Sequence, residues 1–318
     1  MPSSQWLDAG LAGVFGLMIG SFLNVVIYRL PVMMQRDWLS ESVGNLMSIE
    51  HGGPRLWATV FGNTVQEPRN LESAANEAET AIEASPPFTL STPGSRCGGC
   101  GHSIRWFENI PVLSYLFLRG RCSSCNAGIS IRYPLVELVT ASLFALCAWR
   151  FGISASGALW AMFATLLICQ FLIDLDTQLL PDTLNYLLLW LGLIGAAMGL
   201  TGVPVAMAVW GAVFGYLSLW AVYHLFRLAT GKEGMGYGDF KLLAALGAWL
   251  GADYLFAIIL ISSLVGSVLG LTLLVVGKLA NKDIPISFGP FLAGAGLVCL
   301  LFGPDVVREM APFAFPFS

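Results

Sequence analysis

The chain has 318 residues, of which 56% are hydrophobic and 11% are charged, and its formal net charge is −4 at pH 7. Soluble globular domains carry about 25% charged residues, and the mean hydropathy of this chain is +0.72. The composition therefore excludes a soluble globular domain and predicts a protein that crosses a membrane several times.

Apolar segments of membrane length recur along the chain. Residues 9–28 form the first, an uncharged run of 20 residues that is long enough as a helix to cross roughly 30 Å of hydrocarbon. A cleavable signal peptide is the alternative, but the run lacks a basic amino-terminal region and arginines follow it. Residues 183–226 hold 44 residues without a formal charge, enough for two helices with a turn at Gly199, Gly202 and Pro204. The remaining runs are residues 133–149, 151–173, 240–250, 254–277 and 284–304.

Two of these runs leave the number of crossings open. Residues 133–149 contain Glu137, and residues 240–250 are short and rich in Gly and Ala. Counting both predicts an all-α polytopic membrane protein with about eight transmembrane helices, in which 14 of the 16 Lys and Arg lie on one face. The positive-inside rule makes that face cytoplasmic and puts both termini outside. If residues 240–250 form a re-entrant segment instead of a crossing, 13 of the Lys and Arg lie on one face and three on the other. Charge alone therefore does not fix the number of crossings.

One large polar segment, residues 31–133, interrupts the apolar runs. Its first part, residues 33–94, is acidic and mixed, and we expect a short helix over residues 71–82 and loop elsewhere. Its second part, residues 96–132, is basic and holds four of the seven cysteines. We predict three domains: a first transmembrane helix at 1–30, a cytoplasmic domain at 31–133, and a helical membrane core at 134–318.

Two Cys-x-x-Cys motifs, separated by 21 residues, lie in the basic part. Each can place two thiolates beside a tetrahedral ion, and the intervening chain suffices for a hairpin that returns the second motif to the first. Because disulfides are disfavoured on the cytoplasmic face, structural zinc is the leading interpretation, with redox thiols or an incidental pattern as alternatives. The other three cysteines lie within apolar runs, where we expect them to pack. The predicted metal ligands are Cys97, Cys100, Cys122 and Cys125.

Two aspartates at the ends of apolar runs form the candidate catalytic site. Asp174 lies in the sequence Ile-Asp-Leu-Asp, and Asp239 follows Gly-Tyr-Gly. Ionisable side chains at membrane depth are costly and usually face a protein interior or a wet cavity. Paired carboxylates that share one proton are the working groups of aspartic proteases. Asp174 precedes Asp239 by 65 residues and two runs on the same predicted face, which is the topology that convergence requires. The alternative is that Asp174, Asp176 and Asp182 solvate a helix end.

Several motifs, in order along the chain, resemble those of the type IV prepilin leader peptidase and N-methyltransferase family, membrane aspartic proteases that process pilins and type II secretion pseudopilins. The motifs are GSFLNVVIYRLP at 20–31, WFENIP at 106–111, RGRC at 119–122, ID at 173–174, LPD at 180–182 and GYGDFK at 236–241, together with both cysteine motifs. Residues 33–94 lie outside the resemblance and form a longer segment than is usual for the family. Gly98 stands where the family commonly has proline.

The resemblance implies that Asp174 and Asp239 are the catalytic pair of a leader peptidase. Asp174 is preferred over Asp176 because the family's first aspartate stands seven residues before a proline, here Pro181. The resemblance also implies cleavage of a basic leader after glycine and methylation of the new amino terminus with S-adenosylmethionine. Prepilins, pseudopilins and the lipid bilayer of the bacterial inner membrane are the expected partners, and no nucleic acid is expected. The candidates for the methyl-donor site are Glu108, Asn109 and Gly120.

Two other classes of protein compete with this interpretation. An ion-coupled transporter could use intramembrane aspartates in a proton pathway, but it predicts inverted-repeat halves, whereas this chain has a large inside loop in one half alone. A zinc-binding membrane scaffold gives no reason for two aspartates beside glycine-rich helix ends. The sequence has no Walker loop and no strand-based Gly-x-Gly-x-x-Gly, so nucleotide hydrolysis and a Rossmann cofactor site lack support.

Overall fold

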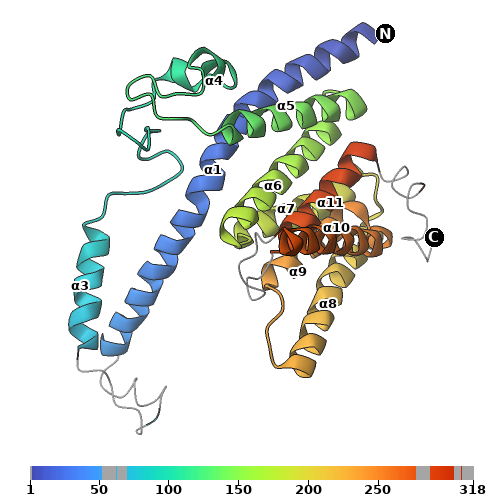
Figure 1. The fold of residues 1–318 in the computed structure, drawn as a ribbon. Coiled ribbons are helices and arrows are strands. Elements are labelled where there is room, and N and C mark those ends of the chain that lie inside the picture. The colour runs from blue at the N-terminus through green and yellow to red at the C-terminus, as the bar shows by residue number, and fades with distance from the viewer. Residues whose placement is uncertain (1, 52–61, 63–69, 277–286, 304–308, 310–318) are drawn as a thin grey trace. The chain divides into compact units, whose positions relative to one another are not determined.

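The computed structural model describes residues 2–51, 62, 70–276, 287–303 and 309. Within them the ordered elements are helices (Figure 1), together with two isolated β-bridges. The α-helices are α1 (Pro2–His51), α3 (Leu71–Glu83), α4 (Leu113–Phe117), α5 (Arg132–Phe151), α6 (Ala155–Thr177), α7 (Asp182–Ala197), α8 (Val205–Thr230), α9 (Tyr237–Leu250), α10 (Leu255–Val275) and α11 (Gly289–Phe302). Two short 3-10 helices are η1 (Trp106–Asn109) and η2 (Ala252–Tyr254).

The apolar runs predicted from the sequence match the helices closely. The run at 183–226 contains α7 and α8, which the turn expected near Gly199 separates, and each of the other runs corresponds to one α-helix. The run at 284–304 begins and ends outside the described residues, and α11 occupies its described part. Among the described residues, five helical segments are long and apolar enough to cross a membrane, in α1, α5, α6, α8 and α10 together with η2, while α7 and α11 are apolar but shorter. The all-α membrane architecture is confirmed, and the count of eight crossings stays a prediction.

Residues 33–94 contain more helix than the sequence predicts. The expected helix at residues 71–82 is confirmed as α3, but α1 continues to His51 and contains Pro31. The expectation of loop directly after the first apolar run is therefore wrong. A proline inside a helix removes one hydrogen bond, but the flanking residues include Leu, Met, Gln and Arg, which are good helix formers and allow the helix to continue.

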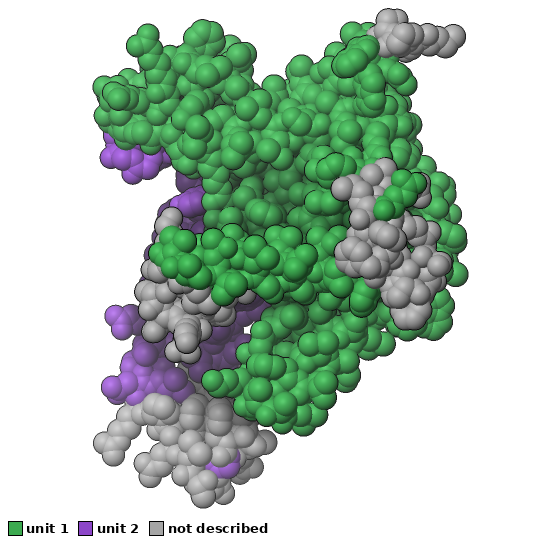
Figure 2. Space-filling model, turned by 45° about the vertical axis from the view of Figure 1, so that its right-hand side comes forward, with its two compact units in different colours: residues 1–27, 105–318 green, residues 28–104 purple. Residues whose placement is uncertain are grey.

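The chain forms two compact units, residues 1–27 with 105–318 and residues 28–104, which Figure 2 colours separately. In the smaller unit, the side chain of Arg29 fixes the segment that follows α3. Its guanidinium donates hydrogen bonds to the carbonyls of Thr89 (2.8 Å), Leu90 (3.3 Å) and Pro93 (2.6 Å). Arg29, which belongs to the motif at residues 20–31, therefore has a structural role within this unit.

Helix α9 is the centre of the larger unit, because α7, α8, α10 and α11 all contact it. Its side chains from Asp239 to Leu250 are almost all buried. Gly211 of α8 and Gly247 of α9 meet where the two helices cross, and a side chain on either would overlap the carbonyl of the other. The indole of Trp249 donates to the carbonyl of Leu188 in α7 (2.7 Å). These contacts fix the position of the first turn of α9, which carries Asp239.

A buried carboxylate joins residues 105–131 to α5. Glu137 accepts a hydrogen bond from the backbone N–H of Val112 (2.7 Å), directly before α4. Near the start of α5, Asn24 of α1 donates to the carbonyl of Tyr133 (3.1 Å). Glu137, the charged residue that left the run at 133–149 open as a crossing, thus has a hydrogen-bond partner. Helix α5, which contains Glu137, is a candidate membrane-spanning helix.

Candidate active site

Helix α6 places Asp174 in its last turn. The helix begins at Ser154, whose side chain accepts a hydrogen bond from the N–H of Gly157 (3.1 Å). It ends at Gln178, whose left-handed conformation lets its N–H donate to the carbonyl of Asp174 (2.9 Å). Asp174 is 2% exposed, so its carboxylate faces the interior of the protein.

Helix α9 presents Asp239 in its first turn, directly after the glycine-rich segment. The backbone N–H of Asp239 donates to the carbonyl of Gly236 (3.3 Å), the residue directly before the helix. Asp239 is 6% exposed, and within the described part of the chain its Oδ1 atom is buried without a hydrogen-bond partner. Leaving a buried carboxylate oxygen unpaired is costly. Among the described residues, Asp239 therefore carries an unused hydrogen-bond acceptor.

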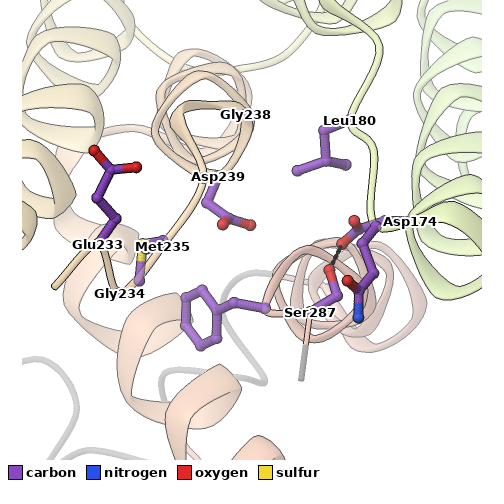
Figure 3. A pocket seen from close by; sticks show the side chains of 11 residues that line it. Asp174, Leu180, Glu233, Gly234, Met235, Gly238, Asp239 and Ser287 are labelled. Carbon is purple, nitrogen blue, oxygen red and sulfur yellow. Dashed lines mark hydrogen bonds between the residues drawn. The ribbon is translucent and has the colours of Figure 1, made fainter. Parts of the chain in front are cut away.

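Asp174 and Asp239 line the same pocket (Figure 3), although 65 residues separate them in the sequence. Figure 3 shows the two side chains reaching toward a common space from different segments of the chain. The cavity has a volume of about 290 Å³. The convergence that the sequence predicts is thus present in the fold. The other lining residues are Gln178, Leu180, Glu233, Gly234, Met235, Gly236, Gly238, Ser287 and Phe288.

Two residues beside Asp174 were missed by the sequence reasoning. The hydroxyl of Ser287 donates a short hydrogen bond to the Asp174 carboxylate, which Figure 3 marks as a dashed line. Gly289 lies directly against this carboxylate, because a Cβ atom on Gly289 would overlap it. A signal was available, because the sequence Ser-Phe-Gly-Pro at residues 287–290 places a turn-forming Gly-Pro pair at the start of an apolar helix.

Leu180 links the three segments that surround the pocket. It lies in the α6–α7 loop, and an added Cβ on Gly238 would lie 2.7 Å from the Cβ of Leu180. An added Cβ on Gly289 would likewise lie 2.9 Å from the Cδ1 of Leu180. The absence of side chains at these two glycines lets the loop, α9 and α11 approach one another, and thereby brings the two aspartates to one cavity.

The two neighbouring aspartates are ion-paired. Asp176 accepts a hydrogen bond from Arg132 of α5 at 2.7 Å, and Asp182 accepts from Lys241 of α9 at 2.7 Å. Neither of them lines the pocket. The alternative that these carboxylates merely solvate a helix end is therefore incomplete, because each joins two helices.

The cysteine motifs adopt matching turns. In each motif the N–H two residues after the first cysteine points at its sulfur, from Gly99 to Cys97 (3.4 Å) and from Ser124 to Cys122 (3.5 Å). Cys97 and Cys100 belong to the smaller unit, and Cys122 and Cys125 belong to the larger one. The four cysteines could hold a metal ion. The three cysteines expected to pack in apolar runs are buried, namely Cys147, Cys169 and Cys299.

The candidates for the methyl-donor site have unequal environments. The carboxylate of Glu108 accepts hydrogen bonds from the N–H of Arg105 (2.9 Å) and from the hydroxyl of Ser123 (2.6 Å). It therefore caps η1 and ties it to the second cysteine motif. Asn109 is exposed, and Gly120 has a φ of +66°. Nothing in this geometry assigns a methyl-donor site, which stays a prediction.

Comparison with known proteins extends the picture to the whole chain. Residues 14–151 match the bacterial peptidase A24 N-terminal domain, and residues 161–271 match the type IV leader peptidase family. The chain is 49% identical to the prepilin leader peptidase/N-methyltransferase of Stutzerimonas stutzeri, over 95% of this chain and 93% of the relative. The chain belongs to the type IV leader peptidase family.

Other relatives agree with this assignment. The prepilin leader peptidase/N-methyltransferase of Pseudomonas aeruginosa is 47% identical over 95% of this chain and 92% of its own length. That of Neisseria gonorrhoeae is 44% identical over 94% of this chain and 92% of its own length. No solved structure matches the chain. Family membership and the apolar helices identify a multi-pass membrane protein, and the alternative of an ion-coupled transporter is not supported.

Proposed function

We propose that this chain removes the leader peptide of prepilins and methylates the new amino terminus, and that Asp174 and Asp239 perform the cleavage. One observation carries the proposal for the cleavage site: two buried carboxylates, from α6 and α9, line one cavity. Buried acidic groups that converge in a pocket are candidates for acid–base chemistry. The names of the relatives, prepilin leader peptidase/N-methyltransferase, support both activities.

In this mechanism one carboxylate is ionised and takes a proton from the attacking water. The other is protonated and polarises the scissile carbonyl through a hydrogen bond. Two nearby carboxylates in a buried site cannot both ionise cheaply, which enforces this division of roles. The tetrahedral intermediate then collapses as the C–N bond breaks, and the departing amine takes up a proton.

Methyl transfer follows at the amino terminus that cleavage releases. The reaction requires the neutral amine, and an α-amino group with a pKa of about 7.7–8.0 supplies a usable neutral fraction near neutral pH. S-adenosylmethionine supplies the methyl group. By resemblance we assign this step to the block at residues 97–132, with Glu108, Asn109 and Gly120 as its candidate residues.

Incubation of the purified full chain with a synthetic prepilin leader peptide and isotopically labelled S-adenosylmethionine tests both activities together. We expect a shortened peptide that carries the label at its new amino terminus. A shortened but unlabelled peptide would restrict the function to proteolysis, and an intact peptide would overturn the proposed function.

We further propose that the chain lies in the bacterial inner membrane with eight crossings and with the pocket on the cytoplasmic side, where it also processes type II secretion pseudopilins. The charge distribution supports this orientation, because 14 of the 16 Lys and Arg fall on that face. Alkaline phosphatase, which is active only outside the cytoplasm, should be inactive when fused after Gly231 and active when fused after Gly152. The reverse pattern would refute the orientation.

We predict one zinc ion per chain, bound by the four thiolates described above. Protein purified without chelator should contain about one zinc by elemental analysis, and the serine variant of any one ligand should lose most of it. Because the aspartates lie on other segments, loss of the metal should impair methyl transfer more than cleavage. Protein that contains no metal would count against the site, and the Cys147→Ser variant provides the control.

Gly120→Val should lower methyl transfer while leaving leader removal largely intact. Gly120 has a φ of +66°, which a β-branched residue adopts poorly, and an added Cβ would lie 2.9 Å from the Oη of Tyr115. Mass spectrometry of the processed peptide should detect a cleaved but unmethylated product. Gly128→Val is the control, because a Cβ there meets nothing within 4 Å. Equal loss of both activities in Gly120→Val would mean that this block supports the protease as a whole.

A further inference from the structure

The two aspartates reach the pocket from two different helices, and the chain that connects these helices does not by itself fix the distance between them. Asp174 lies in the last turn of α6 and Asp239 in the first turn of α9, with all of α7 and α8 between them. Acid–base catalysis requires catalytic groups at fixed separations, and a misplacement of about 1 Å can lower a rate about 100-fold. Some contact near the pocket must therefore hold the α6–α7 loop against the start of α9.

One ion pair contributes to this connection, beside the contact of Leu180 with Gly238. Asp182 is the first residue of α7, and Lys241 lies two residues after Asp239 in α9. The ammonium of Lys241 donates to both carboxylate oxygens of Asp182, each at 2.7 Å. The Lys241 nitrogen also lies 5.4 Å from the ring centroid of Tyr186, one turn further along α7.

The position of the pair in the fold makes it suitable as a clamp. Lys241 is 23% exposed and Asp182 is 53% exposed, so the bond contributes modestly to overall stability in water. However, Asp182 follows Leu180 and Pro181 directly, and Leu180 packs on Gly238, the neighbour of Asp239. The Asp182–Lys241 ion pair and the Leu180–Gly238 contact thus both join the end of the α6–α7 loop to the start of α9.

We propose that Asp182 and Lys241 are positioning residues that hold Asp174 and Asp239 at their working separation. The inference rests on the proposed function, because it assumes that the two pocket aspartates carry out the cleavage. Neither Asp182 nor Lys241 lines the pocket, so neither is expected to touch the substrate. The pair acts on the rate of cleavage through geometry alone.

A double-mutant cycle on the full-length enzyme tests this proposal, with Asp182→Asn, Lys241→Gln and their combination. Each single variant should lower kcat for leader cleavage about 10- to 100-fold with little change in KM. The double variant should be no slower than either single variant, because breaking the pair once removes its whole effect. Lys241→Arg, which keeps the charge, should retain most of the activity. Methylation of a peptide supplied already cleaved should be unchanged.

The Arg132–Asp176 pair provides a matched control. Its contact distance is also 2.7 Å, and its two side chains are 38% and 37% exposed. It joins α6, which carries Asp174, to α5, which carries no pocket aspartate. The same cycle with Arg132→Gln and Asp176→Asn should change kcat less than about threefold.

Three outcomes would overturn the proposal. The first is a wild-type kcat in the Asp182 and Lys241 variants. The second is a fold-loss of kcat in the double variant that equals the product of the two single losses. The third is a loss of kcat in the Arg132–Asp176 cycle as large as that in the Asp182–Lys241 cycle. Thermal unfolding of every variant shows whether a loss comes from misfolding, and a lowered kcat at unchanged unfolding temperature supports positioning. An inactive wild-type enzyme would instead refute the proposed function itself, so the two failures are distinguishable.

Discussion

Asp174→Asn and Asp239→Asn should each lower leader cleavage by about 10²- to 10⁴-fold or more, which is the range that general acid–base groups contribute. Asparagine preserves the shape of the side chain but can neither take a proton from water nor serve as the acid. Both side chains are buried in the pocket wall, so the near-isosteric change should leave expression largely intact. Cleavage is measured with a synthetic prepilin leader by mass spectrometry.

Asp176→Asn is the control for this pair of substitutions. Asp176 lies two residues beyond Asp174 on the same helix, but its side chain pairs with Arg132 and does not line the pocket. We expect a mild effect there. Methylation of a peptide that is already cleaved should survive in both pocket variants. Retention of cleavage in either Asp174→Asn or Asp239→Asn would refute the proposed pair.

Gly289→Ala should lower leader cleavage about 100-fold, although it adds only one methyl group. A Cβ at this position would overlap the carboxylate of Asp174 and would press on Leu180. The substitution therefore displaces the catalytic group itself, and a shift of about 1 Å suffices for a loss of that size. Initial rates of cleavage at saturating peptide measure the effect, and we expect kcat to fall more than KM rises.

Gly294→Ala on the same helix shows whether the site or the helix is affected. The nearest atom to an added Cβ there is in Phe171, at 3.8 Å, which is an ordinary contact. This variant should cleave at nearly the normal rate and, because alanine favours a helix over glycine, should be slightly more stable. If Gly289→Ala is as active as Gly294→Ala, Gly289 does not shape the site as proposed.

The helices were largely predictable from the sequence because the apolar runs are long and are bounded by turn residues and charges. The failures occurred where the pattern is weak. The continuation of α1 past Pro31 was not predicted, because a proline usually ends a helix and the residues after it mix apolar and charged side chains without a membrane-length apolar run. The identity of the family could be inferred from motifs, since several of them occur in the right order.

The candidate site was predictable in part. The two aspartates stand out because carboxylates at the ends of apolar helices are costly, and the even number of helices between them places both on one face. Ser287 and Gly289 were missed because a serine and a glycine carry no charge, and because their relation to Asp174 spans more than 100 residues. The ion pair of Asp182 with Lys241 was missed although both residues are charged, because 59 residues separate them in the sequence. Long-range contacts of this kind depend on how the helices pack, which a sequence pattern does not encode.

The pH dependence of kcat/KM for leader cleavage by the full-length enzyme tests the central claim most directly. If Asp174 and Asp239 share one proton, activity requires one ionised and one protonated carboxylate. The rate should then fall at low pH, where the base becomes protonated, and fall again at higher pH, where the acid loses its proton, giving a bell-shaped profile. A rate that rises with pH to a plateau would indicate a single general base and would contradict the shared-proton pair.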